Sequence, residues 1–467
     1  MNKFSYLGSW WLPSDPTRQI EGTLTFDPVD GAFLELIGSF QDNVFHFDRT
    51  LQVEFMHGLT VNGKETTLFH CMHTQMTSSA GGIPTSKYRI ELVLIGHHFQ
   101  DRAEIAFNEY KVRYSFLEEW LGQRVFAFDS QGVRSHDRRA FNITYTTPED
   151  ISATIDDLSI TITSSMSTAT PVGGTVSASH SNAIKIASSS PISFADFLGT
   201  HNYLMQNFLA LALGIATRPL EIVAHRADVT KQIGSDLIRP KDVQIFFPMS
   251  ANPNEGSQIH PHLMIFAFAD ISQHFETTLK LWFTKQTVLR PVYDLYFAIL
   301  NTANNYAENE FLSYVFALES YHRRTQPDKY LDDEDALEEV RQALTRAVPD
   351  SIPEDFRSSL KQKFKYINEY SFRRRLKDIF ALFGNVVSSF LPNTQGFIDD
   401  IATTRNYMVH FDAALEADSL KHENLFWATR KLRALIQICL LHELGFSMER
   451  IKNIVESKQA FKYLQGH

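Results

Sequence analysis

The sequence predicts an α+β protein of more than one domain, in which a β-rich N-terminal domain of sandwich or barrel type precedes an all-α helical bundle. Three observations support this fold class. The chain has 467 residues, which is too long for one ordinary hydrophobic core. Short apolar-polar alternations separated by turn signals fill its first third, and after His262 the apolar residues recur almost entirely at helical intervals.

Composition narrows the class of protein. Hydrophobic residues make up 43% of the chain and charged residues 21%, and the 37 Phe predict a large aromatic core. Cys71 and Cys439 are too few for a disulfide framework. The N-terminus lacks the apolar stretch of a signal peptide, and no apolar run is long enough to cross a membrane, so we expect a cytoplasmic protein. A net charge of −10 argues against a protein that coats nucleic acid nonspecifically.

The β-rich part is predicted from alternation and turn residues. The Asn62-Gly63 pair marks a hairpin, and the Ser/Thr/Gly-rich stretch Ser164 to Ser181 predicts a long exposed loop. The expected strands are Thr23 to Phe26, Phe33 to Ile37, Val53 to Val61, Thr66 to Cys71, Tyr88 to Ile95, Arg102 to Phe107, Val112 to Phe116, Arg124 to Phe128, Phe141 to Tyr145, Leu158 to Thr163, Leu220 to Ala224 and Val243 to Phe247.

Helical periodicity begins with Phe194 to Gly214, which lies between predicted strands. The remaining helices are expected at 270–285, 288–302, 309–324, 333–347, 354–367, 371–391, 396–415, 420–443 and 447–458. We therefore predict a β-rich domain over residues 1–262, a helical connector over 263–305 and a helical bundle over 306–467.

The stretch from Thr403 to Asp412 is the strongest candidate for chemistry, because it places Arg405, Asn406 and His410 in one helical pattern. An RNA strand carries its own nucleophile, the ribose 2′-OH, so cutting it needs a proton acceptor, a proton donor and positive charge on the phosphate. Imidazole exchanges protons near neutral pH, and a guanidinium binds phosphate oxygens bidentately. These residue types therefore suit RNA cleavage.

Helix geometry constrains how these groups meet. Asn406 and His410 share one helix face, whereas Arg405 lies roughly 140° away from His410 around the axis. Either Arg405 sits at a loosened helix start and swings its side chain round, or the groups converge across a two-fold interface that uses this helix twice. We favour the second route.

Charged and histidine-rich stretches elsewhere have two interpretations each. Arg323, Arg324 and the run Arg373, Arg374 and Arg375 would contact RNA phosphates or would lie on solvated helix faces. The acidic run Asp328 to Glu339 would mimic RNA or would begin a solvated helix. The pairs His97-His98 and His260-Pro-His262 lack partners at ligand spacing, so we predict no metal site and no cofactor.

Two stretches together resemble a known family. The opening Gly8-Ser-Trp-Trp-Leu-Pro13, with Gly22 to Pro28 and Leu34 to Phe40 after it, resembles the start of the ApeA N-terminal domain. The sequence Arg405-Asn406-x-x-x-His410 resembles the nuclease motif of HEPN domains, and an ApeA-type HEPN domain normally follows that N-terminal region.

This resemblance implies a bacterial antiphage defence protein of the abortive-infection type. Its β-rich part would sense or regulate, and its HEPN bundle would be a metal-independent endoribonuclease that works as a homodimer or larger homo-oligomer. Arg405 and His410 match the catalytic pair and Asn406 the adjacent polar position. Glu319 is our candidate for the further acidic residue that HEPN nucleases often carry in an earlier helix. A phage component would be the trigger, and transfer RNA is one candidate substrate.

In the expected reaction, His410 takes the 2′-OH proton or protonates the 5′-oxygen, and Arg405 stabilises the phosphorane-like charge. The products would be a 2′,3′-cyclic phosphate and a 5′-OH. Asn406 would orient the imidazole or the phosphate, and Glu319 would hold Arg405. Two alternatives remain: a non-catalytic sensor or scaffold whose bundle only dimerises, and a protein whose β domain, binding carbohydrate or a phage protein, is the functional centre.

Overall fold

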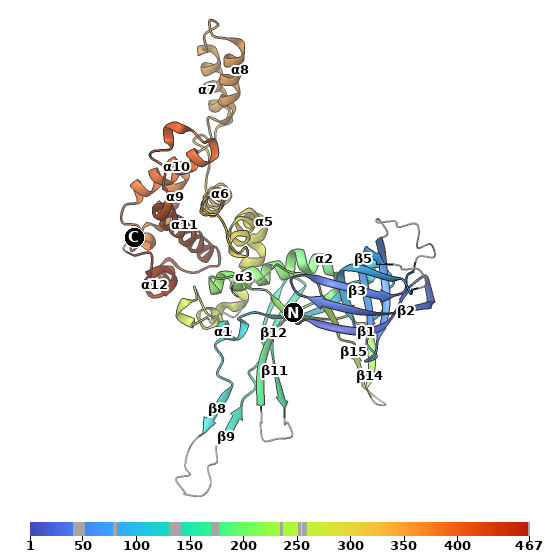
Figure 1. Ribbon diagram of the computed structural model, residues 1–467. Helices are drawn as coiled ribbons and strands as arrows, with labels where there is room; N and C mark the ends of the chain where they lie inside the picture. Colours follow the sequence, from blue (N-terminus) through green and yellow to red (C-terminus); the bar gives the residue numbers. More distant parts are fainter. Residues whose placement is uncertain are drawn as a thin grey trace. The chain divides into compact units, whose positions relative to one another are not determined.

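The computed structural model describes residues 1–40, 52–77, 82–129, 142–169, 177–233, 237–250, 254 and 259–465 (Figure 1). The chain forms two compact units. The first comprises Met1–Phe283 with Asn301–Ala303, and the second comprises Thr284–Leu300 with Asn304–His467. The first unit is β-rich and the second is helical, which confirms the predicted fold class. The predicted domain limits at residues 262 and 305 remain predictions.

Six strands at the N-terminus close into a barrel. Following the antiparallel pairings from strand to strand gives the cyclic order β1-β2-β3-β6-β5-β4-β1. The six strands are β1 (Phe4–Leu12), β2 (Asp15–Asp27), β3 (Gly31–Ile37), β4 (Gln52–Thr60), β5 (Glu65–Thr77) and β6 (Thr85–Ile95). The barrel thus begins one strand earlier than the first strand that alternation predicts.

Trp10 shows how the barrel core is packed. Its side chain is fully buried, and its indole N–H donates to the Gly22 carbonyl at 3.1 Å. Gly58 on β4 faces the ring so closely that a methyl group there would overlap it. The absence of a side chain at Gly58 therefore leaves the room that the Trp10 ring occupies. Trp11, the next residue, packs edge-on against His98 with ring centroids 5.3 Å apart.

A second set of strands continues from the barrel through β6. Strand β6 pairs with β5 along its length, with β3 over Thr85 to Ile90, and with β16 over Val93 to Ile95. The sheet then runs in the order β16-β13-β7-β12-β11-β10. These strands are β7 (Ala106–Tyr114), β10 (Ile151–Ile155), β11 (Leu158–Ala169), β12 (Ser177–Ser193), β13 (Pro219–His225) and β16 (Val243–Phe246).

Shorter elements complete the first unit. Two small hairpins pair β8 (Phe126–Asp129) with β9 (Asn142–Tyr145) and β14 (Thr230–Ile233) with β15 (Leu237–Pro240). Its short helical elements are η1 (Arg102–Glu104), α1 (Leu117–Leu121), η3 (Pro261–Leu263), α4 (Phe268–Ile271) and η4 (Ser272–His274).

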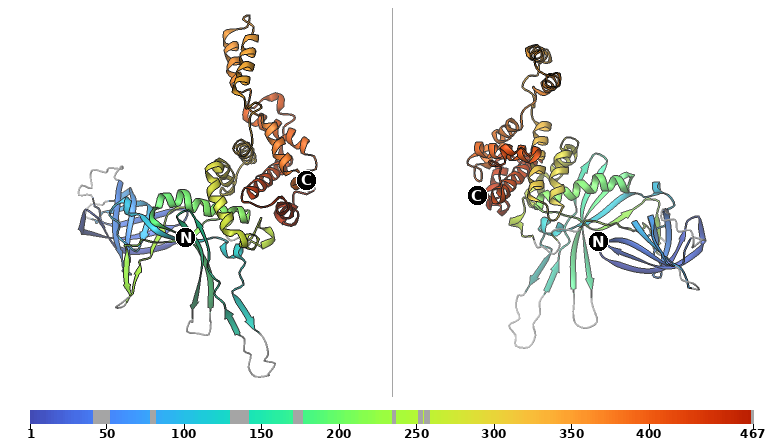
Figure 2. Two further views of the ribbon diagram at one scale, coloured as in Figure 1. Left: turned by 180° about the vertical axis from the view of Figure 1, so that it is seen from behind. Right: turned by 45° about the horizontal axis from the view of Figure 1, so that its top comes forward.

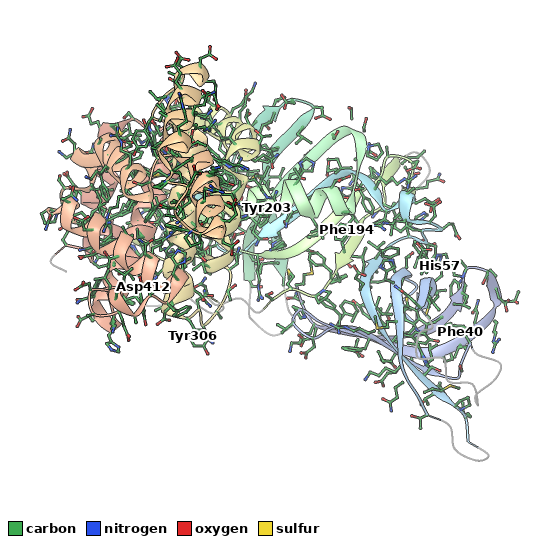
Figure 3. All side chains as sticks on the ribbon, turned by 90° about the horizontal axis from the view of Figure 1, so that it is seen from above. Phe40, His57, Phe194, Tyr203, Tyr306 and Asp412 are labelled. Carbon is green, nitrogen blue, oxygen red and sulfur yellow. The ribbon has the colours of Figure 1, made fainter. Side chains whose placement is uncertain are left out.

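The helical segment predicted from Phe194 to Gly214 is confirmed. It consists of α2 (Phe194–Asp196), the π-helical turn η2 (Phe197–Asn202) and α3 (Tyr203–Leu213), and Phe194 and Tyr203 are labelled on it in Figure 3. Gly214 ends it in the left-handed conformation that favours glycine. The Phe197 ring stacks on Tyr110 of the sheet with centroids 3.8 Å apart, so apolar packing fixes the helix on the strands.

Two predictions for the β-rich part are wrong. Most of the stretch predicted as a loop is strand, since β11 runs to Ala169 and β12 starts at Ser177, and residues 170–176 lie outside the described residues. Polar Ser and Thr hide the alternation, but the backbone ladder does not need an apolar face to form. The strands predicted at Arg102 to Phe107 and Val112 to Phe116 are one strand, β7. It starts at Ala106, because Asp101 accepts hydrogen bonds from the backbone N–H groups of Ala103 and Glu104 and caps η1.

The second unit is helical throughout (Figure 2). Its helical elements are the C-terminal part of α5 (Phe275–Leu300), then α6 (Ala307–Thr325), α7 (Glu334–Ala347), α8 (Glu354–Lys363), η5 (Phe364–Tyr366), α9 (Phe372–Val387), α10 (Thr394–His410), η6 (Ala413–Leu415), α11 (His422–Glu443), α12 (Met448–Ser457) and α13 (Gln459–Lys462). Among the described residues, no helix is long and apolar enough to cross a membrane.

Two helix boundaries differ from the prediction. The two helices expected at 270–285 and 288–302 are one helix, α5, which continues through Pro291 because Leu289 and Val292 on either side of it are fully buried. The helix expected at 396–415 ends at His410, where Phe411 takes a left-handed conformation and Asp412 caps the separate turn η6. This early end places His410 at a helix terminus.

The α7–α8 pair is an insertion that is closed at its base. Asn368 accepts hydrogen bonds from the backbone N–H groups of Tyr330 and Leu331 at 3.0 and 2.8 Å, and its amide donates to the Leu331 carbonyl at 2.8 Å. A β-bridge between Lys329 and Glu369 lies beside it. The chain therefore leaves and re-enters the bundle at one point, between α6 and α9.

Replacing Gly58 by Ala tests the packing of the barrel. The added methyl group would overlap the Trp10 ring, so we expect unfolding to become easier by about 1–3 kcal/mol. Urea denaturation followed by tryptophan fluorescence measures the effect. Gly199→Ala is the matched control, because its new methyl group meets open space within a helix. Equal stability of the two variants would contradict this packing role.

Candidate active site

Helix α10 carries the candidate site and is anchored by a stripe of buried residues. Asn393 caps its N-terminus by accepting from the Gly396 N–H at 3.0 Å. The buried positions recur at helical intervals: Phe397, Ile398, Ile401, Ala402 and Thr404. The Thr404 hydroxyl accepts from the Leu420 N–H at 2.9 Å, which ties the segment after the helix back onto it. Arg405 therefore directly follows Thr404, a buried residue that hydrogen-bonds to the segment after the helix.

Arg405 lies between three side chains. Its guanidinium is 3.7 Å from Glu319 on α6, donates to the Asn406 side-chain oxygen at 3.1 Å, and lies 5.9 Å from the centre of the Phe372 ring on α9. The side chain is 23% exposed, and its Nε–H has no hydrogen-bond partner among the described residues. The cation is thus held in place while its side chain stays partly exposed to a phosphate.

His410 is the last residue of α10 and is exposed. No hydrogen bond or ion pair joins its ring to another side chain in the described part of the chain. Phe411 follows it with φ of 51° and a side chain 76% exposed, and its ring makes an edge contact with Tyr407. The structure gathers Arg405, Asn406 and Glu319 within one chain and leaves the imidazole open.

The arginines predicted to bind RNA fall into different environments. Arg323 pairs with Glu369 at 3.0 Å and with Glu319 at 3.5 Å, so it shares a carboxylate with Arg405. Arg373 pairs with Asp399 at 3.2 Å and donates to Thr403, both on α10. These two cations therefore lie on helices that border the candidate site.

Two further arginines point elsewhere. Arg324 donates to the Val288 carbonyl on α5 at 3.1 Å, and Arg374 pairs with Asp378 at 2.9 Å and lies over the Tyr370 ring. Both remain exposed, and their part in RNA binding stays a prediction.

Arg375 corrects the predicted RNA-binding set. Its side chain is fully buried, donating to His322 Nδ1 at 3.3 Å and facing Asp328 at 3.9 Å. It cannot reach RNA without unfolding, so this arginine is a structural one. His322 is also fully buried, and with Nδ1 accepting from Arg375 its Nε2–H donates to Asp378 at 3.1 Å. Burial lowers the pKa of His322, outweighing the carboxylate that raises it.

Sequence reasoning missed Glu369, which anchors Arg323, and Phe372, which lies under Arg405. Phe372 directly follows Ser371, whose hydroxyl accepts from the Arg374 N–H and caps α9. The Ser-Phe pair therefore marks a helix start, but nothing local shows that the ring faces α10. Both residues are recognisable only once α6, α9 and α10 are packed together.

The arrangement offers a fixed cation and an open acid–base group on one helix. It suits cleavage of a phosphodiester that brings its own hydroxyl nucleophile. Among the described residues, no group of three or more His, Cys, Asp or Glu side chains lies close enough to hold a metal ion.

The buried imidazole of His322, which donates to the partly exposed Asp378, predicts a pH dependence of stability. The folded pKa of His322 is below that of an unfolded histidine, about 6.5, so the unfolded chain binds more protons and folding loses stability as pH falls below that value. We expect the melting temperature of the helical unit to drop between pH 7.5 and 5.5 more in the wild type than in His322→Gln. His410→Gln is the control for an exposed imidazole, and an identical drop in all three proteins would disprove the assignment.

Comparison with known families agrees with this geometry. Residues 5–282 match the model of ApeA N-terminal domain 1, and residues 312–450 match that of the Apea-like HEPN domain. No curated protein and no solved structure is similar enough to count as a match. HEPN domains are generally ribonucleases and typically dimerise. Since the first match alone covers more than half of the chain, the protein belongs to the ApeA family of HEPN nuclease defence proteins.

Proposed function

We propose that the protein is a metal-independent endoribonuclease of antiphage defence, with Arg405 and His410 as its catalytic pair. The observation that carries this proposal is the environment of Arg405. Glu319 and Phe372 position the Arg405 guanidinium, and its side chain stays 23% exposed, so it can reach a phosphate, whereas the structural Arg375 is fully buried. An exposed imidazole follows on the same helix.

The mechanism needs no group beyond these side chains. The 2′-oxygen attacks the phosphorus as the bond to the 5′-oxygen breaks; His410 takes the proton of the 2′-OH and gives it to the departing 5′-oxygen, while Arg405 stabilises the charge that develops on the phosphorus oxygens. The products are a 2′,3′-cyclic phosphate and a 5′-OH. Asn406 accepts from Arg405 at 3.1 Å and so orients the guanidinium rather than the imidazole in the free protein. Glu319 is a positioning residue.

The complete site requires two copies of the helix. Arg405 turns toward Glu319 on α6 within its own chain, and His410 lies more than one turn further on and is exposed. Pairing two α10 helices about a two-fold axis would bring Arg405 of each chain beside His410 of the other, so that each dimer has two sites. We therefore propose a homodimer formed through the HEPN domain, with Arg323 and Arg373 along the RNA path.

A ribonuclease of this kind needs to be regulated. An unrestrained ribonuclease in the cytoplasm would kill its host, so we propose that the β-rich unit keeps the enzyme inactive until a phage component appears. Transfer RNA is the substrate that we favour, because its loss halts translation and aborts the infection.

The competing function is a non-catalytic scaffold, and the ion pair between Arg405 and Glu319 is what favours it. In that case Arg405 would only join α10 to α6, and His410 would have no role. Loss of folding in Arg405→Ala, together with no RNA cleavage by the wild type under any trigger, would support the scaffold.

Removing the imidazole tests the proposal directly. We expect His410→Ala to lower RNA cleavage by about 10²- to 10⁴-fold, since the side chain transfers a proton in the transition state. Cleavage of total RNA by purified protein is the measurement, with and without EDTA, and wild-type activity should resist the chelator. His422→Ala removes another exposed imidazole of the same unit and should cut normally. Full activity of His410→Ala, with fold intact, would refute this role.

Mixing two inactive variants tests the shared site. If Arg405 of one chain works with His410 of the other, a mixed dimer of Arg405→Ala and His410→Ala keeps one intact site of two. Random mixing makes half of the dimers mixed, so about one quarter of wild-type activity should return. Mixing each variant with itself is the control. No recovery, despite subunit exchange shown by mass spectrometry, would argue against a site of one Arg and one His from opposite chains.

A further inference from the structure

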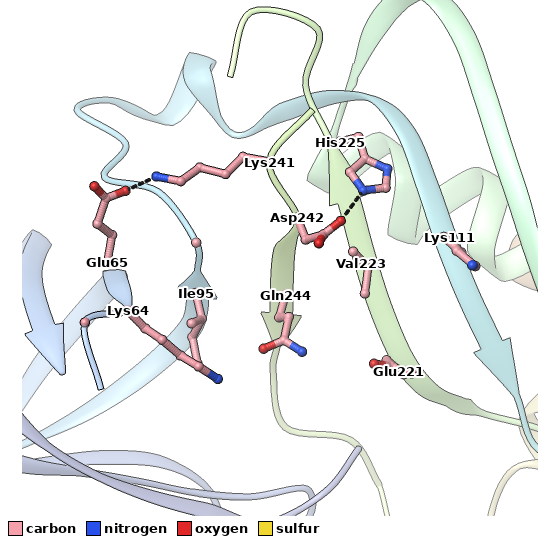
Figure 4. A pocket seen from close by; sticks show the side chains of 12 residues that line it. Lys64, Glu65, Ile95, Lys111, Glu221, Val223, His225, Lys241, Asp242 and Gln244 are labelled. Carbon is pink, nitrogen blue, oxygen red and sulfur yellow. Dashed lines mark hydrogen bonds and ion pairs between the residues drawn. The ribbon is translucent and has the colours of Figure 1, made fainter. Parts of the chain in front are cut away.

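A pocket of about 580 Å³ lies in the β-rich unit, where the barrel continues into the second sheet (Figure 4). Its floor is one cross-strand row. Lys111 on β7 pairs with Val223 on β13, Val223 with Gln244 on β16, and Gln244 with Ile95 on β6. Four adjacent strands thus present one side chain each, and Lys64 from the β4–β5 turn overhangs the row.

The floor belongs to the polar face of the sheet. Alternate residues on the same strands, including Tyr110, Val112, Ile222 and Val243, are fully or almost fully buried and point to the opposite face. A polar sheet face is normally flat and open to water. Here the β4–β5 turn with Gly63 and Lys64 lies on one side of the row, and Lys241 and Asp242 also line the pocket, so this face becomes a concave site.

The carboxylates of the pocket are all paired. Glu65 contacts Lys241 at 2.5 Å, Asp242 contacts His225 at 2.7 Å, and Glu221 contacts Arg113 at 3.4 Å. His225 also contacts Glu109 at 3.0 Å, and this second carboxylate, with Asp242, raises its pKa and favours the imidazolium. The acidic groups are therefore already neutralised within the wall and floor.

Two cations lack such partners. Lys64 lies with its ammonium 5.2 Å from the centre of the Tyr6 ring, and Lys111 has no carboxylate partner among the described residues. Figure 4 shows them on opposite sides of the pocket, with Gln244 and Val223 between them. The pocket consequently carries net positive charge at both ends and a neutral amide beside apolar surface in the middle.

We propose that this pocket binds a small organic phosphate of nucleotide size. Ammonium groups bind phosphate oxygens as point charges, and Lys64 and Lys111 are long enough to converge on a ligand that lies between them. The Gln244 amide offers both a donor and an acceptor to a base edge, while the partly exposed Val223 supplies apolar contact to a ring. The volume lies within the range of small-molecule sites.

The test uses the full chain and isothermal titration with ATP, GTP and a cyclic dinucleotide, beside inorganic phosphate and citrate. We expect at least one nucleotide to bind, and Lys64→Met and Lys111→Met each to weaken it by about tenfold or more. Gln244→Leu should alter the preference between bases. Lys87→Met is the matched control, because Lys87 lies on β6 outside the pocket and pairs with Glu35.

Three outcomes would overturn the proposal: no nucleotide binds, phosphate or citrate binds as tightly as the best nucleotide, or the pocket variants bind like Lys87→Met. Circular dichroism of each variant shows that it is folded. The experiment measures binding alone, so its outcome does not depend on whether the helical unit cleaves RNA.

Discussion

The contact between Arg405 and Glu319 is the constraint on which the candidate site depends. It joins α10 to α6 across 3.7 Å, a distance that attracts two charges without forming a tight hydrogen bond. A shorter, bidentate pair would use the donors that a phosphate needs. Glu319 is also shared with Arg323, whose stronger contact is with Glu369. The arrangement thus fixes the position of the Arg405 guanidinium without a bidentate pairing that would occupy its donors.

Much of this fold could be predicted from the sequence, because its signals are local. The Ser/Asp start and Gly214 end of the first helical segment, the Asn62-Gly63 turn and the apolar stripe of α10 all act within a few residues. The boundaries that failed depend on distant contacts. The helix continues through Pro291 with Leu289 and Val292 buried near it, and Ser164 to Ala169 forms a strand because β12 lies beside it.

The candidate site divides in the same way. Arg405, Asn406 and His410 stand out by residue type and spacing, and the family resemblance suggests Glu319; in the fold Arg405 contacts both Asn406 and Glu319. Arg375 reads like its neighbours Arg373 and Arg374 in sequence, yet it alone turns into the core toward His322 and Asp328. The position of each arginine around the helix axis decides whether its side chain lies on the surface or in the core. A run of three identical residues does not show which of them faces the core.

The backbone of Phe411 has a consequence for the stability of this region. A left-handed backbone costs a bulky L-residue about 1–2 kcal/mol that glycine would not lose, and this ring gains little burial in return. Glycine at the end of α10 would make the isolated folded chain more stable. The aromatic ring therefore adds exposed apolar surface directly beside the open imidazole at a cost to folding.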